Sequence, residues 1–161
     1  MPLAFLHQPV LLFCPLAIWR GGAMNPMAAL FLQKWTHGMA EPLTGIRVLV
    51  VEDNEDNRFL ITESLRFQGA LVESVSAARE AAEMLDGYDI IVTDYAMPDR
   101  DGVWLLEQAQ HRVTPVPVIL LSGFTEAQRE AIATAAFALK LLKPVEPEDL
   151  VTAILKTLNR A

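Results

Sequence analysis

From residue 46 onward, short runs of aliphatic and β-branched residues alternate with segments that have helical spacing. The first run, 46–51, is almost entirely apolar rather than alternating, which is typical of a strand buried on both faces. A regular strand–helix alternation predicts an α/β fold with a parallel sheet. The other four predicted strands occupy residues 70–75, 90–93, 116–121 and 139–142.

Five helical segments complete the pattern, and local signals mark several of their ends. Gly69 lies where the first helix would end, a position that favours glycine, while Ser76 and Thr125 are suited to cap the helices that follow them. Because crossovers between parallel strands are right-handed, we expect a doubly wound sheet of five parallel strands with helices on both faces. The predicted helices are 54–68, 77–85, 103–110, 125–136 and 148–158.

Polar residues gather at the carboxyl ends of these strands, where ligands bind in open α/β sheets. Three of them are carboxylates, which repel one another without a cation, and a hard divalent ion such as Mg²⁺ prefers such ligands. A hydroxyl and an ammonium beside them could hold a phosphoryl group, with one carboxylate as the nucleophile. The residues are Glu52, Asp53, Asp94, Ser122 and Lys143.

Each of these residues also has a plain structural explanation. Aspartates at strand ends commonly cap helices or turns, and a single lysine is usually a solvated surface residue. All five residues lie at the ends of four strands, and this joint position is explained better by one shared functional site than by chance. No glycine-rich phosphate loop follows the first strand, so a bound nucleotide is not indicated.

Four segments together resemble the receiver domain of two-component response regulators. The most specific of them reads D-x-x-M-P-x-x-D-G. The similarity extends over about residues 45–160, and it implies the flavodoxin-like fold of that family with strand order 2-1-3-4-5. The segments are 50–54 (VVEDN), 94–102 (DYAMPDRDG), 120–123 (LLSG) and 142–144 (LKP).

The resemblance implies a phosphoryl acceptor with a Mg²⁺ ion beside it. Asp94 resembles the phosphoacceptor aspartate of the family. In its acidic pair, Asp53 corresponds to the direct metal ligand and Glu52 to the residue that acts mainly through water. Asp94 itself and the backbone carbonyl of Ala96 would be further metal ligands.

The resemblance also assigns the remaining groups and the partners. Ser122 resembles the hydroxyl that moves toward the phosphoryl group, and Lys143 the amine that pairs with it. A cis Lys143–Pro144 peptide bond is expected, since it aims the amine into the site. The expected donor is a histidine kinase or a histidine phosphotransfer protein, and the expected output is binding to a downstream protein in the cytoplasm.

Two departures from the family pattern lie within the matched segment: the residue at position 140 is neither aromatic nor histidine, and residues 135–139 lack the glycine that usually precedes the fifth strand. Lys140 stands where an aromatic residue or histidine usually takes part in switching, and we expect its ammonium to stay outside the core because burial without a partner is costly. Ala96 and Phe124, two residues beyond Asp94 and Ser122, cannot orient an attacking water by hydrogen bonding. We therefore expect slow loss of the phosphoryl group.

Two classes of function stay open. The first is a signalling module without enzymatic turnover, either a stand-alone receiver or the detached receiver of a hybrid kinase, with no output domain. The second is an aspartyl-phosphate hydrolase of the haloacid dehalogenase type, which needs a second aspartate two residues after the nucleophile. That position is Ala96, so the signalling module is favoured.

Composition and the first 43 residues add limits. A net charge of −7 argues against a nucleic-acid partner, and one cysteine and three scattered histidines argue against a zinc cluster. Residues 1–43 carry few charges, and their apolar stretch, 3–19, is interrupted by Pro9 and Pro15 and is too short for a membrane span. Three explanations are open for these residues: an artefact of an upstream start site, a weak membrane or partner anchor, or a structured extension. The first of these is favoured.

Overall fold

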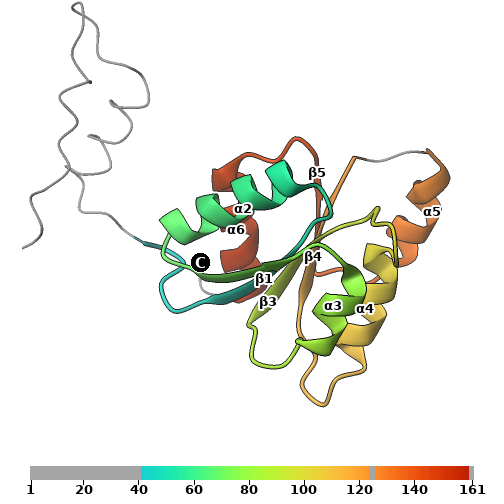
Figure 1. Cartoon of the computed structure of the whole chain (residues 1–161), viewed down its shortest axis with the longest axis horizontal. Coiled ribbons are helices and arrows are strands. Elements are labelled where there is room, and N and C mark those ends of the chain that lie inside the picture. Colours follow the sequence, from blue (N-terminus) through green and yellow to red (C-terminus); the bar gives the residue numbers. More distant parts are fainter. Residues whose placement is uncertain (1–40, 124–125, 160–161) are drawn as a thin grey trace, which may run out of the picture. The chain divides into compact units, whose positions relative to one another are not determined.

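The computed structural model describes residues 41–123 and 126–159. Five strands form one parallel sheet in the order β2-β1-β3-β4-β5, which confirms the predicted topology (Figure 1). The compact unit that contains the sheet begins at Glu41. The strands are β1 (Arg47–Val51), β2 (Leu71–Val75), β3 (Ile90–Asp94), β4 (Val118–Ser122) and β5 (Leu139–Leu142).

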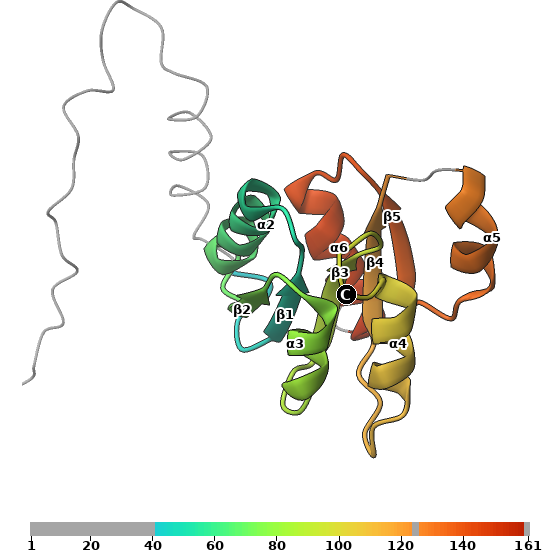
Figure 2. The ribbon, with the colours of Figure 1, turned by 45° about the vertical axis from the view of Figure 1, so that its right-hand side comes forward.

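Five helices cover the two faces of this sheet. Figures 1 and 2 show α2 and α6 on one face and α3, α4 and α5 on the other, so the sheet is doubly wound as predicted. Each face has its own apolar layer, and alternate residues of the central strands point into one layer or the other. The helices are α2 (Glu55–Phe67), α3 (Ala78–Glu83), α4 (Gly102–Gln110), α5 (Glu126–Thr134) and α6 (Pro147–Thr157).

The start of β4 differs from the prediction for a local reason, whereas the end of α2 agrees with it. β4 begins at Val118 rather than at residue 116, because Pro117 has no N–H to donate to a neighbouring strand and contributes only its carbonyl, to Ile91. Gly69 ends α2 as expected and has a φ of +90°, a conformation that other residues rarely adopt.

The cap of α3 comes from another part of the chain. The predicted cap, Ser76, is wrong: the N-cap position is Ala77, which has no side chain able to cap. Instead the carboxylate of Asp99 accepts hydrogen bonds from the backbone N–H groups of Ala78 at 3.3 Å and Arg79 at 3.0 Å. The loop after β3 is thereby tied to the start of α3.

Residues near the start of the described chain also belong to the core. Leu43 is fully buried, and its N–H donates to the carbonyl of Gln68 at 3.0 Å. Among the residues that the structure describes, no helix is long and apolar enough to cross a membrane. The expectations for residues 1–40 lie outside the described residues.

We expect Asp99→Ala to lower the free energy of unfolding by about 1 kcal/mol, the usual effect of losing a helix cap. Desolvation acts to raise the pKa of Asp99, although its side chain is exposed, but hydrogen bonds from backbone N–H groups outweigh it and hold the pKa below its ordinary value. A carboxyl with a lowered pKa stabilises the fold above its unfolded-state pKa and loses that effect as the pH falls through its folded-state pKa.

Urea denaturation at neutral pH and near pH 3 measures this contribution. The difference between wild type and Asp99→Ala should shrink at the lower pH. Asp86→Ala is the control, because this carboxylate is 81% exposed and pairs only with Arg112 among the described contacts. Equal losses in the two variants would contradict the role of Asp99 as a cap.

Candidate functional site

The parallel register places the predicted site residues along one edge of the sheet. Val51 of β1 is paired with Thr93 of β3, Asp94 with Leu121 of β4, and Ser122 with Leu142 of β5. The residues at or just after the strand ends therefore emerge at the same edge. This alignment follows from the pairing of the strands and needs no long loop to bring the side chains together.

Three carboxylates meet at this edge. Glu52, Asp53 and Asp94 each offer one oxygen, and these atoms all lie within 4.8 Å of one another. Glu52 is buried, Asp94 is half-buried and Asp53 is exposed, so the cluster opens to solvent on the side of Asp53. A set of hard oxygen donors fits Mg²⁺ rather than a soft metal.

Lys143 supplies a positive charge within the cluster. Its ammonium lies 2.7 Å from Oε2 of Glu52 and 3.1 Å from Oδ1 of Asp94. Burial alone would lower the pKa of Lys143, but the hydrogen bond to Glu52 and the charges of Asp94 and Glu52 outweigh it and raise the pKa above its ordinary value. Lys143 therefore stays protonated at neutral pH.

The end of β4 is joined to Lys143 through the backbone. Ser122 is buried, and its carbonyl accepts a hydrogen bond from the N–H of Lys143 at 3.0 Å. The Lys143–Pro144 peptide bond is cis, which confirms that prediction. Direct contacts or strand register thus join four of the predicted site residues, namely Glu52, Asp94, Ser122 and Lys143.

Steric crowding explains why the D-x-x-M-P-x-x-D-G motif ends in a glycine, Gly102. A Cβ added at Gly102 would lie 2.6 Å from the backbone oxygen of Asp94, closer than such contacts occur. The N–H of Gly102 also donates to the carbonyl of Tyr95 at 2.9 Å. Asp101 caps α4 by accepting from the N–H of Trp104 at 2.8 Å. The aspartate–glycine pair therefore closes the loop that follows Asp94.

Sequence reasoning missed the contacts of Arg58. This residue of α2 directs its guanidinium back toward the segment before the helix, where it donates to the carbonyls of Glu52 and Asp53. Asn54 caps the same helix by accepting from the N–H of Asn57 at 3.0 Å. The only signal for Arg58 in the sequence was its place in the segment that follows the acidic pair.

Lys140 is directed toward α5. Its ammonium donates to the carbonyl of Ala133 in the last turn of that helix at 3.2 Å, and it lies 6.0 Å from the centre of the Phe137 ring. A cation at this position also suits the negative end of the helix dipole. Phe124 and Thr125 lie outside the described residues, and the role of the Ala96 carbonyl as a metal ligand stays a prediction.

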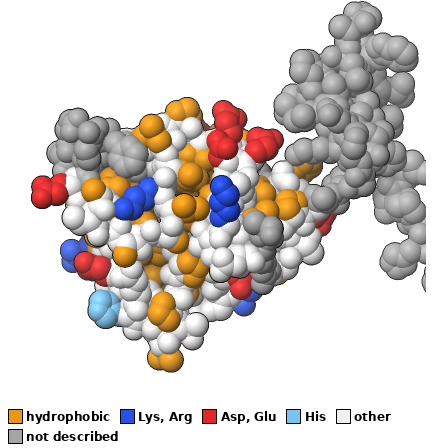
Figure 3. Space-filling view, turned by 180° about the vertical axis from the view of Figure 1, so that it is seen from behind, with side chains coloured by type: hydrophobic (Ala, Val, Ile, Leu, Met, Phe, Trp, Pro, Cys, Tyr) orange, Lys and Arg blue, Asp and Glu red, His pale blue; other side chains and the backbone are white. Residues whose placement is uncertain are grey.

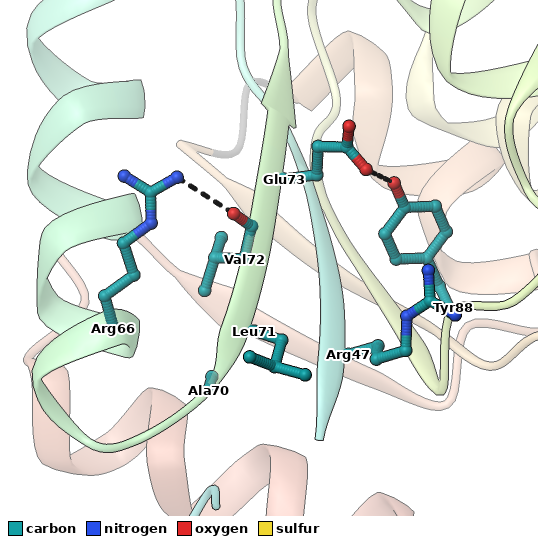
Figure 4. Close-up of a pocket in the computed structure, with 7 residues that line it drawn as sticks. All are labelled: Arg47, Arg66, Ala70, Leu71, Val72, Glu73 and Tyr88. Carbon is teal, nitrogen blue, oxygen red and sulfur yellow. Dashed lines mark hydrogen bonds between the residues drawn. The ribbon is translucent and has the colours of Figure 1, made fainter. Parts of the chain in front are cut away.

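A separate open pocket lies at the opposite edge of the sheet, beside the start of β2 (Figure 4). The guanidinium of Arg47 lies over the ring of Tyr88, whose hydroxyl donates to Glu73. On the other side of β2, Arg66 donates to the carbonyl of Val72 at 2.9 Å, as Figure 4 shows. None of the predicted site residues lines this pocket.

Comparisons with a family model, with curated proteins and with solved structures all point to the same family. Residues 48–155 match the family model described as the response regulator receiver domain. The chain is 33% identical over 124 residues to "Regulator of RpoS" of Escherichia coli K12, covering 76% of this chain and 34% of that protein. It is 36% identical over 111 residues to "Two-component response regulator ARR11" of Arabidopsis thaliana, covering 66% of this chain and 21% of the relative. The chain thus spans about a third or less of these two relatives.

Solved structures give the same result. The receiver domain of sensor histidine kinase PA1611 from Pseudomonas aeruginosa, described with a magnesium ion coordinated in its active site cleft, matches with a TM-score of 0.67 and 26% identity, over 72% of this chain and 99% of that chain. A response regulator receiver domain protein from Clostridium thermocellum matches with a TM-score of 0.63 and 28% identity, over 71% and 95% of the two chains.

We expect Gly102→Ala to lower the free energy of unfolding by about 1–3 kcal/mol, because the added methyl group must displace the backbone of Asp94. Gly123→Ala is a matched control beside the same edge, since a Cβ there meets nothing within 4 Å. Denaturant unfolding of both variants measures the difference. A loss in Gly123→Ala as large as that in Gly102→Ala would show that the close approach to Asp94 is not the cause.

Proposed function

The chain belongs to the response regulator receiver domain family, and on this premise we propose that it accepts a phosphoryl group on Asp94 within a two-component phosphorelay. The observation that supports this most strongly is the meeting of three carboxylates within 4.8 Å, with the Lys143 ammonium bound to two of them. Such an arrangement combines a nucleophile, oxygen ligands for a metal and a cation for a phosphoryl group.

In the proposed reaction, an oxygen of Asp94 forms a bond to phosphorus while the P–N bond of a phosphohistidine breaks. The departing imidazole nitrogen takes up a proton, and Asp94 becomes an acyl phosphate. Lys143 is already within 3.1 Å of Asp94, so its ammonium can pair with the incoming phosphoryl oxygens without a large movement. Ser122, at the end of the neighbouring strand, is the proposed hydroxyl donor to that group.

Mg²⁺ is the proposed cofactor, held by Asp53, Asp94 and the carbonyl of Ala96, with Glu52 acting through water. When bound, it would neutralise carboxylate and phosphoryl charge during transfer. The residues present fit that ion, because every side-chain donor in the cluster is a carboxylate oxygen. Lys143 balances the charge of Glu52 in the structure, which leaves exposed Asp53 as the carboxylate most accessible to an entering cation.

The position two residues after Asp94 favours a signalling module over a hydrolase. Ala96 has no group that could donate a proton to a leaving oxygen or orient a water. We therefore propose that the phosphoryl group is long-lived and that the chain takes part in no turnover beyond its own phosphorylation and dephosphorylation. A stand-alone receiver and the detached receiver of a hybrid kinase are both compatible with this proposal.

The proposed partners are proteins: a histidine kinase or histidine phosphotransfer protein as the donor, and a downstream target. Phe59 and Leu60 on α2 and Leu142 beside Lys143 are large apolar residues that are each about 60% exposed. Figure 3 shows apolar side chains in several patches on one face of the molecule, with a few charged side chains among them. The exposed apolar residues and the net charge of −7 support protein partners rather than nucleic acid.

The proposal predicts that a small phosphodonor such as acetyl phosphate labels the wild-type chain to at most one phosphoryl group, and only with Mg²⁺. Asp94→Asn should abolish labelling, and Asp53→Ala should weaken both Mg²⁺ binding and labelling. Asp86→Asn, an exposed carboxylate away from the site, is the control. Undiminished labelling of Asp94→Asn would contradict the assignment, and steady release of phosphate without accumulated phosphoprotein would favour the hydrolase.

A second prediction concerns Lys140. Because its ammonium binds the end of α5, we expect it to take no part in the response of the site. A phosphoryl mimic with Mg²⁺ should change the fluorescence of Trp104, in the first turn of α4, equally in wild type and Lys140→Ala. Loss of the response in Lys140→Ala, with unchanged Mg²⁺ affinity, would show that the lysine is part of the switch.

A further inference from the structure

We propose that Arg58 is a positioning residue that holds the acidic pair Glu52 and Asp53 in the orientation that metal binding requires. The inference rests on the proposed function of the carboxylate cluster. In this proposal, Arg58 contacts neither the metal nor the phosphoryl group. Arg58 acts instead on the backbone that carries the two carboxylates.

A single guanidinium nitrogen of Arg58 donates hydrogen bonds to two successive peptide carbonyls. Nη1 of Arg58 lies 2.7 Å from the carbonyl oxygen of Glu52 and 3.2 Å from that of Asp53. Hydrogen bonds from a guanidinium to a carbonyl are stronger than those between neutral groups. Both carbonyls are consequently fixed relative to α2, since the backbone N–H of Arg58 is also bound to the carbonyl of Asn54 at 2.9 Å.

These carbonyls belong to the connection that directs the acidic side chains. Between β1 and α2 the backbone leaves the strand and enters the helix within three residues, Glu52, Asp53 and Asn54. The N–H of Glu52 is bound to Val75 on β2, and the side chain of Asn54 caps the helix. Arg58 completes this set by binding the two carbonyl groups, and the orientation of a peptide plane determines where the adjoining side chains point.

Two effects of Arg58 on a bound cation oppose each other. Its charge repels a nearby Mg²⁺, whereas its hydrogen bonds keep the ligands in place. Removing the charge alone would tighten metal binding, and removing the hydrogen bonds would weaken it. We infer that positioning dominates, because solvent screens a charge at a half-buried side chain, while a displaced ligand is lost from the site.

The test compares Arg58→Met, which removes the charge and the donors, with Arg58→Lys, which keeps the charge but not the guanidinium. Mg²⁺ affinity of the full chain is measured by calorimetry in each variant. We expect Arg58→Met to bind about tenfold more weakly than wild type, as for other residues that orient metal ligands, and Arg58→Lys to lie between them. Tighter binding by Arg58→Met, or affinity equal to wild type in both variants, would overturn the proposal.

Arg66→Met is the matched control. Arg66 is on the same helix and also donates to a backbone carbonyl, that of Val72, but at the opposite edge of the sheet. Its loss removes the same charge and the same kind of bond, together with an exposed ion pair to Glu63, and should leave Mg²⁺ affinity unchanged. A loss of affinity equal to that of Arg58→Met would assign the effect to the helix or to net charge and would also overturn the proposal.

A metal-free measurement separates this inference from the proposed function. Hydrogen exchange of the backbone amides of residues 53–55 should be faster in Arg58→Met than in wild type and unchanged in Arg66→Met. If wild type binds no Mg²⁺, the proposed function fails whatever the exchange shows. If wild type binds Mg²⁺ and Arg58→Met shows neither faster exchange nor weaker binding, only the role of Arg58 fails. Should Arg58→Met not fold, Arg58→Lys carries both measurements.

Discussion

The burial of Glu52 is the constraint on which the rest of the edge depends. A carboxylate with 2% of its side chain exposed is stable in the charged form only with a partner that replaces water. That partner, Lys143, comes from beyond the last strand of the sheet, 91 residues later in the chain. Removing one member of a buried ion pair typically costs about 3–5 kcal/mol, so the pair links the correct assembly of β1 and β5 to the stability of the domain.

The same edge holds more negative charge than one lysine neutralises. Asp53 and Asp94 lie beside Glu52, and their mutual repulsion opposes folding unless other groups compensate. Contacts to backbone groups stabilise the loops that carry them: Arg58 binds the connection after β1, and Asp99 joins the loop after β3 to α3. The site is therefore kept in place by side chains that contribute no ligand of their own.

Much of this arrangement could be predicted from the sequence, because it depends on patterns that have a fixed period. Aliphatic runs predicted the strands, and parallel strands bring their carboxyl ends together, which placed Glu52, Asp94 and Lys143 at one edge. The strand order and the individual roles came from the family resemblance rather than from periodicity. The steric need for Gly102 depends on the position of the backbone oxygen of Asp94, which no sequence pattern gives.

The contacts that were missed share a physical cause. Asp99 caps a helix 20 residues earlier in the chain, and Arg58 turns back on the segment before its own helix. Both bonds join a side chain to backbone groups whose positions depend on loop conformation, which no hydrophobic period describes. Similarly, the packing of Leu43 depends on the turn at the start of the domain, whereas the composition of residues 1–43 grouped it with the preceding apolar stretch.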